Sequence, residues 1–345
     1  MTTYYVDGVS GSDANDGLSV GTAWQTIQKV FNEVGVTLTT HDDVRIMATA
    51  DYDLAGTGLN SSTNFLGAIV GANAAGVVDG TRAKITTTVA QQSLLEISSS
   101  LTAFAYLDFD GNSLTTHALS AATVNCRNFW FHCLFHDAIQ AGSYQGYAGG
   151  QCRHRFLRCE FFNNGADGVY GRGATIIECE IHDNVDAGIF GNQSDAVHVG
   201  NRIYANGIGL EGLSSAEGIF FGNTIDDCDV GLELNYNSGS YAGGNQITNC
   251  GTSIKNLGTL NYLYHFSDNL HGNTGRSSLG AELSFLETAV DPAYNDPSTR
   301  DYDYSTAAAA DALAPFTLYV GAGTYLLATG GGGSPRTGFG RAVRL

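Results

Sequence analysis

The feature of this sequence that most restricts its fold is an internal repeat of 20 to 26 residues. In each copy an anchor residue is followed two positions later by a bulky apolar residue. The pairs are Leu107 with Phe109, Cys133 with Phe135, Cys159 with Phe161, Cys179 with Ile181, Asn201 with Ile203, Asn223 with Ile225, Asn245 with Ile247 and Asp268 with Leu270. A unit this short holds two or three short strands and cannot bury its own apolar face, so successive units must stack at the ~4.8 Å spacing of paired strands. The repeat therefore predicts an all-β chain folded as a parallel β-helix.

The seven cysteines fall into columns of this repeat. One column holds Cys133, Cys159 and Cys179, a second Cys126 and Cys152, and a third Cys228 and Cys250. Because no Cys-x-x-Cys pair occurs, we interpret them as small apolar side chains that fill ladders inside the coil, and we predict no metal site and no cofactor. A column of turn asparagines follows the anchors, and we expect its amides to satisfy backbone groups.

The ends of the chain differ from the repeating middle, as the caps of a solenoid must. Within the N-terminal part, residues 23–34 have the pattern of an amphipathic helix that can plug the open end of the coil. The early rungs over 36–125 are expected to be irregular. The expected parts are an N-terminal strand and capping helix (1–40), the β-helix (41–285), a C-terminal cap (286–329) and a flexible, Gly-rich basic tail (330–345).

The charge balance and the N-terminal sequence restrict the partners and the compartment. Acidic residues outnumber basic ones 34 to 16 and give a formal net charge of −18, which repels a phosphate backbone. No run of 18 apolar residues and no basic, apolar leader pattern is present. We therefore expect no nucleic acid partner, no membrane insertion, and synthesis in a reducing cytoplasm with free thiols. Secretion after removal of a signal peptide is the alternative.

Three segments near the N-terminus carry a family resemblance. They are Tyr4-Tyr-Val-Asp, Gly11-Ser-Asp-Ala-Asn-Asp-Gly and Trp24-Gln-Thr-Ile-Gln-Lys. Together with the Asn-rich rungs, they resemble the right-handed parallel β-helix proteins of the pectate-lyase-like superfamily. The resemblance implies a right-handed solenoid, but that superfamily includes polysaccharide lyases, glycoside hydrolases, phage tailspikes and catalytically silent virion proteins. The arginine-centred signatures and calcium-binding aspartates of pectate lyases are not recognisable in the rungs, which argues against lyase activity.

The outer face of the rungs offers two glutamates as catalytic candidates. Strand alternation places Glu160 and Glu180 as stacked neighbours on adjacent rungs, roughly 5 Å apart. Two coupled carboxylates at this spacing could act as the acid and the nucleophile of a glycosidase. Arg158 and Arg202 flank them, and the alternative interpretation is an ordinary ladder of ionised surface charges, or a cation site.

Other outward residues are candidates for glycan binding. Aromatic rings can stack on sugars and acidic side chains can accept hydroxyl hydrogen bonds, but such a ridge can equally form a subunit contact, and loop tyrosines can simply anchor their loop. The candidates are Tyr170, Phe190, Glu211 and Glu233 in a column after the Asn turn, His182 and Tyr204 on the outer face, and Tyr144 and Tyr147 in an expected loop over 140–150.

Two classes of function remain. We predict a phage virion surface protein, either capsid-decorating or tailspike-like, that is structural, binds glycans and forms a homotrimer. Its basic tail would contact capsid or tail proteins through Arg336, Phe339, Arg341 and Arg344. A cell-surface polysaccharide is a further expected partner. The alternative is a polysaccharide lyase or glycoside hydrolase acting on the outer face of the β-helix. We favour the non-enzymatic virion protein at this stage.

Overall fold

The computed structural model describes most of the chain in two compact units, residues 1–175 and 176–345. The described residues are 1–34, 36–39, 41–61, 65–98, 102–121, 127–145, 153–171, 173–192, 196–213, 218–234, 239–257, 262–266, 268, 270–275, 277–278, 281–285, 294–296, 301–304, 324–325 and 336–337. Strands dominate both units. Among the described residues, the helices are η1 (Val20–Thr22) and α1 (Ile27–Glu33), and neither these nor any other described segment is a helix long and apolar enough to cross a membrane.

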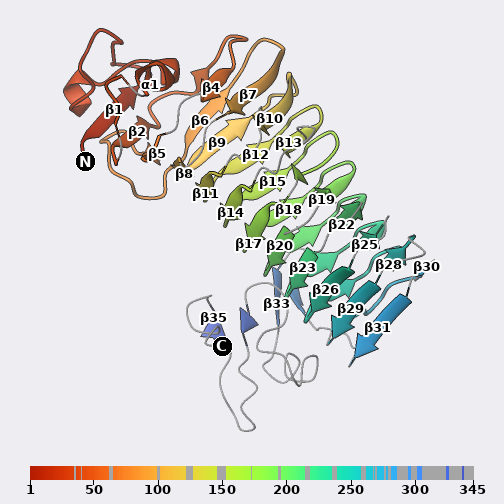
Figure 1. Ribbon diagram of the computed structural model, residues 1–345. Coiled ribbons are helices and arrows are strands. Elements are labelled where there is room, and N and C mark those ends of the chain that lie inside the picture. The colour runs from red at the N-terminus through yellow and green to blue at the C-terminus, as the bar shows by residue number, and fades with distance from the viewer. Residues whose placement is uncertain are drawn as a thin grey trace. The chain divides into compact units, whose positions relative to one another are not determined.

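Three parallel sheets build the first unit, and each turn of the chain adds one strand to each sheet (Figure 1). Sheet I contains β1 (Thr3–Asp7), β2 (Asp43–Met47), β5 (Ala68–Ala72), β8 (Ala103–Ala105), β11 (Phe129–Phe131) and β14 (Arg155–Leu157). Sheet II contains β3 (Tyr52–Asp53), β6 (Ala83–Thr86), β9 (Leu107–Asp110), β12 (Leu134–His136) and β15 (Glu160–Phe162). Sheet III contains β4 (Leu59–Ser61), β7 (Gln91–Ile97), β10 (Thr115–Ala121), β13 (Ala141–Tyr144) and β16 (Val169–Gly171).

The second unit has the same three-strand turn. Its first set of parallel strands is β20 (Ala196–Val199), β23 (Gly218–Phe221), β26 (Gly239–Gly243), β29 (Tyr262–Phe266) and β31 (Ala281–Phe285). The second set is β18 (Glu180–His182), β21 (Arg202–Tyr204), β24 (Thr224–Asp226) and β27 (Gln246–Thr248). The third is β19 (Ala187–Asn192), β22 (Ile208–Leu213), β25 (Val230–Leu234), β28 (Thr252–Asn256) and β30 (Ser277–Ser278). β17 (Thr175–Ile177) spans the division between the units.

Two antiparallel strand pairs follow the last parallel strand. β32 (Tyr294–Asp296) pairs with β33 (Asp301–Tyr304), and β34 (Thr324–Tyr325) pairs with β35 (Arg336–Thr337). The flexible tail from residue 330 stays a prediction, and its described residues are Arg336 and Thr337 of β35. The remainder of that tail lies outside the described residues.

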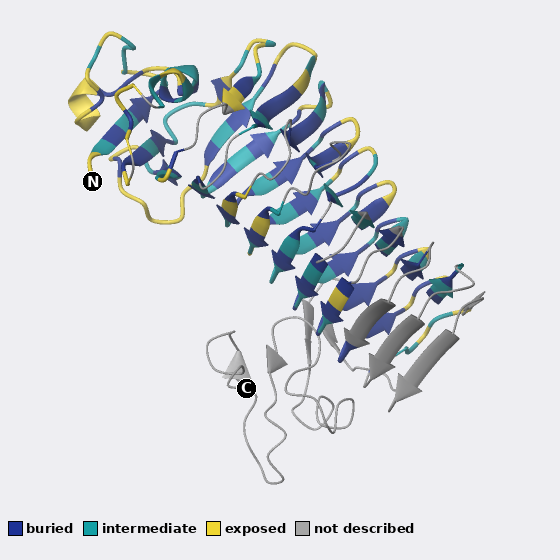
Figure 2. Ribbon diagram, in the orientation of Figure 1, coloured by how far each residue is buried: buried dark blue, intermediate teal, exposed yellow. Residues whose placement is uncertain are grey.

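The interior of the first unit is a column of stacked side chains, as the repeat predicts. Phe109, Phe135 and Phe161 occupy equivalent positions of neighbouring strands and are fully buried. Their ring centroids are 5.2 Å and 4.9 Å apart, and the rings are parallel within 2° and 10°. Figure 2 shows the resulting alternation of buried and more exposed positions along the strands. The prediction of an all-β parallel β-helix is confirmed.

Sharp bends keep the strands of sheet II only two to four residues long. The residue before each anchor has a left-handed backbone, with φ of 52° at Tyr106, 52° at His132 and 54° at Arg158. The residues after β12 and β15 bend likewise, with φ of 53° at Asp137 and 54° at Asn163. His132 and Arg158 therefore lie at corners between strands.

Side-chain ladders hold successive turns together. In the second unit, Asn201 donates through Nδ2 to Oδ1 of Asn223 at 2.9 Å, and Asn223 donates to Asn245 at 3.0 Å. Asp268 continues the ladder and accepts from Asn245 at 3.0 Å. The turn asparagine Asn206 donates to the carbonyl of Ile181 at 3.1 Å, so the structural role predicted for the turn amides is confirmed there.

The cysteine ladders are also confirmed where the structure describes them. Five cysteines are buried free thiols; they are Cys133, Cys159, Cys179, Cys228 and Cys250. Burial is the main reason that the pKa of the Cys133 thiol lies well above its usual value, which makes this thiol unreactive. Cys126 and Cys152 lie outside the described residues.

The N-terminal cap is more strand-like than the sequence predicts. The helix α1 begins only at Ile27, because the Thr26 side chain caps it and Asp13 accepts hydrogen bonds from the backbone of both Gln25 and Thr26 at 2.9 Å. Trp24 does not join the helix but forms a parallel bridge with Val6. The turns over 36–125 are also more regular than expected, since β2, β5 and β8 pair in continuous register.

Candidate functional site

A cluster of charged side chains lies on the outer face of sheet II in the first unit. In β6, β9 and β12 the inward positions belong to Ile85, Phe109 and Phe135, so the residues on either side of them point outward. Those outward residues include Lys84 on β6, Asp108 and Asp110 on β9, and His136 on β12. Asp137 follows at the left-handed bend after β12. Parallel register thus gathers residues that are 24 to 28 positions apart in the sequence.

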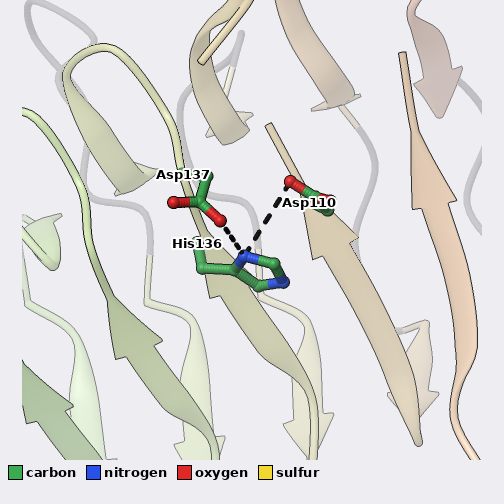
Figure 3. A group of neighbouring side chains, drawn as sticks. All are labelled: Asp110, His136 and Asp137. Carbon is green, nitrogen blue, oxygen red and sulfur yellow. Dashed lines mark hydrogen bonds and ion pairs between the residues drawn. The ribbon is translucent and has the colours of Figure 1, made fainter. Parts of the chain in front are cut away.

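His136 is held between carboxylates on both of its ring nitrogens. Nε2 lies 2.7 Å from Oδ1 of Asp108, and Nδ1 lies 2.7 Å from Oδ2 of Asp137. Oδ1 of Asp110 is 3.8 Å from the same Nδ1 (Figure 3). The imidazole stacks on the ring of Phe162, the next outward residue along the sheet, with centroids 4.5 Å apart. Its side chain is only 10% exposed, so these contacts fix the position of the ring.

These contacts control the protonation of His136. Burial alone lowers the pKa of this imidazole, but the hydrogen bonds to Asp108 and Asp137 and the charge of Asp110 outweigh burial and raise it. With a proton on each nitrogen the ring donates to two carboxylates at once, which the neutral ring cannot do. His136 is therefore a positioned acid with acceptors already aligned on either side.

Lys84 connects this group to the first turns of the coil. Its Nζ lies 2.7 Å from Oδ2 of Asp110 and 3.9 Å from Oδ2 of Asp51. The hydrogen bond that Lys84 donates to Asp110 is the main reason that the pKa of Lys84 is raised. The four carboxylates exceed the two cations, Lys84 and protonated His136, so the face keeps an excess of negative charge.

Asp110, His136 and Asp137 lie close enough together to be considered as ligands of a cation. One ligand atom each from Asp110, His136 and Asp137 can be chosen so that all lie within 4.8 Å of one another. A metal ion there would have to displace the proton on Nδ1 and compete with Lys84 for Asp110. The present arrangement of donors and acceptors suits proton transfer better than metal binding.

The predicted glutamate pair is divided between the two units. Glu160 lies half-buried on β15, in register with Leu134. Glu180 lies on β18 of the second unit, where the hydroxyl of Tyr204 donates to its Oε1 at 2.5 Å. The stacking of Glu160 on Glu180 stays a prediction, because the two residues belong to different units.

The predicted glycan-binding residues occupy several environments. In the first unit, Tyr144 lies on strand β13 and not in the expected loop, and its ring stacks on His117 at 4.2 Å and on Tyr170 at 4.9 Å. Both tyrosines are half-buried, whereas His117 is buried, which lowers its pKa to about 4. Tyr147 lies outside the described residues.

Most of the glycan-binding candidates in the second unit are buried, whereas a residue that binds a glycan has to be accessible. His182 stacks on Tyr204 at 4.7 Å, and both are buried. Glu233 is buried and forms an ion pair with Lys255 at 2.8 Å. Phe190 and Glu211 are half-buried partners on β19 and β22. Of the predicted attachment residues, Arg336 lies in β35, while Phe339, Arg341 and Arg344 lie outside the described residues.

The cluster around His136 contains residues that we did not single out from the sequence. A signal was present in the motif Phe135-His136-Asp137, which recurs as Ile181-His182-Asp183 at the same place in the repeat. In both copies Nδ1 of the histidine contacts the next aspartate, at 2.7 Å and 2.8 Å. The participation of Lys84, Asp108 and Asp110 depends on register between turns, which the motif does not contain.

Comparison with known families identifies the solenoid. Residues 132–270 match the family model described as the right handed beta helix region. The chain is a right-handed parallel β-helix. Its handedness agrees with the expected hand of parallel crossover connections, and the fold implied by the N-terminal resemblance is confirmed. The comparison of this β-helix with curated protein sequences gives no match.

Three solved structures illustrate the similarity in fold. A pectate lyase, Pel9A, superposes with a TM-score of 0.63 at 14% identity over 87% of this chain and 84% of its own. XylC in complex with xylose gives 0.60 at 9% identity over 80% and 70%, and a rhamnogalacturonan lyase gives 0.56 at 13% over 86% and 91%. At these identities the likeness establishes the fold alone. The tailspike part of our resemblance stays a prediction.

Proposed function

We propose that this β-helix acts on a polysaccharide bound along the outer face of sheet II in the first unit, with His136 as the proton-transferring group. The observation that carries the proposal is the position of His136 between the carboxylates of Asp108 and Asp137. Similar folds in a pectate lyase, a rhamnogalacturonan lyase and a protein solved with xylose support a carbohydrate ligand. The proposal goes beyond the fold, which unrelated functions share.

The charges of the site favour hydrolysis of an uncharged glycan. An excess of carboxylates over cations repels the uronate groups that a lyase substrate carries. In hydrolysis, the glycosidic oxygen would displace Asp137, the more exposed of the two partners, from Nδ1 of protonated His136. His136 then donates the Nδ1 proton to that oxygen as the bond to the anomeric carbon breaks. Water supplies the hydroxyl to that carbon and its proton to a carboxylate. We assign the base to Asp137, because at 37% its side chain is more exposed than those of Asp108 (19%) and Asp110 (13%).

The test compares His136→Asn with the wild type on neutral, amino-sugar and uronate polysaccharides. Released reducing ends report hydrolysis, and absorbance of unsaturated products reports elimination. Loss of general acid catalysis should lower hydrolysis by about 10²-fold or more. His41→Asn is the matched control, because His41 is exposed and its φ of 70° suits asparagine. Equal cleavage by His136→Asn, or no cleavage by the wild type, would contradict the proposal.

The glutamates predicted from the sequence provide a competing assignment. Glu160→Gln and Glu180→Gln should retain hydrolysis if His136 and its carboxylates perform the chemistry. Loss of activity in both glutamine variants, with retention in His136→Asn, would instead assign the chemistry to the glutamates.

We also propose that the chain is carried on a phage virion, as a homotrimer attached through residues 330–345. The supporting observation is the reversal of charge in the sequence, since an acidic chain ends in a segment with three arginines and no acid in its last ten residues. A basic segment of this kind can contact an acidic patch of a capsid or tail protein. Glycan binding on the outer face is compatible with this location.

A further inference from the structure

A half-open cavity of about 470 Å³ lies at the N-terminal end of the first unit, away from the His136 cluster itself. It lies between the start of α1 and the segment 50–57, which contains β3, the first strand of sheet II. No residue of the cavity belongs to the site described above except Asp51, which contacts Lys84. Its volume falls in the ~300–1,000 Å³ range of small-ligand pockets, so the cavity has room for a short ligand.

The lining of the cavity combines an apolar wall with polar groups. Ile27, Leu54 and the ring of Tyr52 provide the apolar part. The Tyr52 ring is fixed, because its hydroxyl lies 2.7 Å from the carbonyl of Met47 and 3.2 Å from that of Val6, and accepts from the backbone of Gly8. Gln25 and Gln28 add amides that can donate and accept. A pyranose ring offers the complementary surface, with C–H groups on its faces and hydroxyls at its edge.

Two carboxylates and no basic side chain line this cavity. Asp51 is well exposed, and its Oδ2 lies 3.9 Å from Nζ of Lys84. Asp53 accepts hydrogen bonds from the Thr88 hydroxyl at 2.6 Å and from the backbone of Ala55 at 2.8 Å. The bond from Thr88 is the main cause of its lowered pKa, so this carboxylate stays ionised near neutral pH. The cavity therefore favours neutral or cationic ligands over anionic ones.

A continuous series of charged contacts leads from the cavity to the proposed site. Asp51 at the cavity contacts Lys84, Lys84 contacts Asp110, and Asp110 lies 3.8 Å from the ring of His136. All four residues belong to the outer side of the first turns of sheet II. A glycan with one end in the cavity would extend along these residues toward His136.

We propose that this cavity is a subsite for the terminal one or two residues of a neutral or amino-sugar glycan. Cleavage would then occur at a chain end, and this consequence rests on the proposed function of His136. Binding of the terminal sugar does not depend on that function, because no cavity residue takes part in proton transfer.

The experiment titrates glucose, galactose, glucosamine and glucuronate, and their disaccharides, into the full chain by calorimetry and ligand-observed NMR. We expect at least one neutral or amino sugar to bind and glucuronate to bind about tenfold more weakly, a difference of about 1.4 kcal/mol. Thr57→Trp should weaken sugar binding about tenfold, since residue 57 lines the cavity and is exposed. Val78→Trp, at another exposed position of the first unit, is the control.

Two further variants separate the possible failures. Asp51→Asn should strengthen glucuronate binding severalfold while leaving the fold intact, because its side chain is 66% exposed. His136→Asn should bind the short sugars as the wild type does. The subsite proposal is overturned if no sugar binds, if Thr57→Trp binds as well as Val78→Trp, or if glucuronate binds as well as glucose. Intact sugar binding together with unimpaired hydrolysis by His136→Asn would overturn the proposed function alone.

Discussion

Nε2 of His136 lies 2.7 Å from Oδ1 of Asp108, a residue of the neighbouring strand in sheet II. The contact is diagonal, because Asp108 is in register with Leu134 and His136 with Asp110. It places a carboxylate on the ring nitrogen that Asp137 does not reach. His136 thus connects a residue of the preceding turn, Asp108, with Asp137 at the bend after its own strand.

Asp108→Asn should lower the pKa of His136. The pKa of His136 is raised in the folded wild-type chain. The interaction of His136 with Asp108 therefore stabilises the fold fully below the unfolded pKa of about 6.5. This stabilisation is lost as pH rises through the folded pKa. The ring-proton titration of His136, followed by NMR, should show a lower midpoint in the variant. Asp79→Asn, in an exposed loop, is the control, and an unchanged midpoint in Asp108→Asn would contradict the assignment.

His198→Phe should make the chain less sensitive to acid. His198 is buried against Phe220, burial lowers its pKa to about 3, and its Nδ1 has no hydrogen-bond partner in the described structure. The unfolded chain takes up this proton below about pH 6.5 and the folded chain does not until about pH 3, so stability falls as pH drops through that window. Denaturant unfolding at pH 4 and pH 7 should differ less in the variant than in the wild type. An equal or larger difference would show that His198 does not contribute to acid sensitivity.

Asn223→Ala should destabilise the second unit by about 3 kcal/mol or more, because several buried groups lose their partners. Asn223 accepts from the backbone of Asn201 at 3.0 Å, accepts from the Asn201 amide at 2.9 Å and donates to the carbonyl of His198 at 3.0 Å. Asn60→Ala is the control, since Asn60 is exposed and donates one side-chain hydrogen bond to Glu96. Equal unfolding free energies for the two variants would mean that the ladder does not stabilise the coil.

Deletion of residues 330–345 should leave thermal unfolding of the coil unchanged and prevent incorporation into phage particles. Within the described residues, the deletion removes β35, which pairs with β34 and with no strand of the parallel sheets. Replacement of Arg336, Arg341 and Arg344 by glutamine is a milder variant that keeps the chain length. Truncated protein that decorates virions at full occupancy would show that the segment is not needed for attachment.

The regular part of the coil was predictable because each turn repeats a local pattern. Anchor and apolar residues such as Cys133 with Phe135 or Asn223 with Ile225 recur at nearly constant spacing, and stacking is the one arrangement that buries all of them. The fold class and the buried cysteines therefore followed from the sequence. The early turns lack asparagine and cysteine anchors, so the regular pairing of β2, β5 and β8 was not evident from it.

The candidate site was decided by tertiary structure. Lys84 aligns with Asp108 across 24 residues, and Asp110 aligns with His136 across 26, so loops of different length set which side chains meet. A shift of one residue would turn Asp108 and His136 to the inside of the coil. The sequence determined that these turns stack, because burial of a repeated apolar pattern requires it, whereas the register between turns brought a lysine, a histidine and their carboxylates into one network.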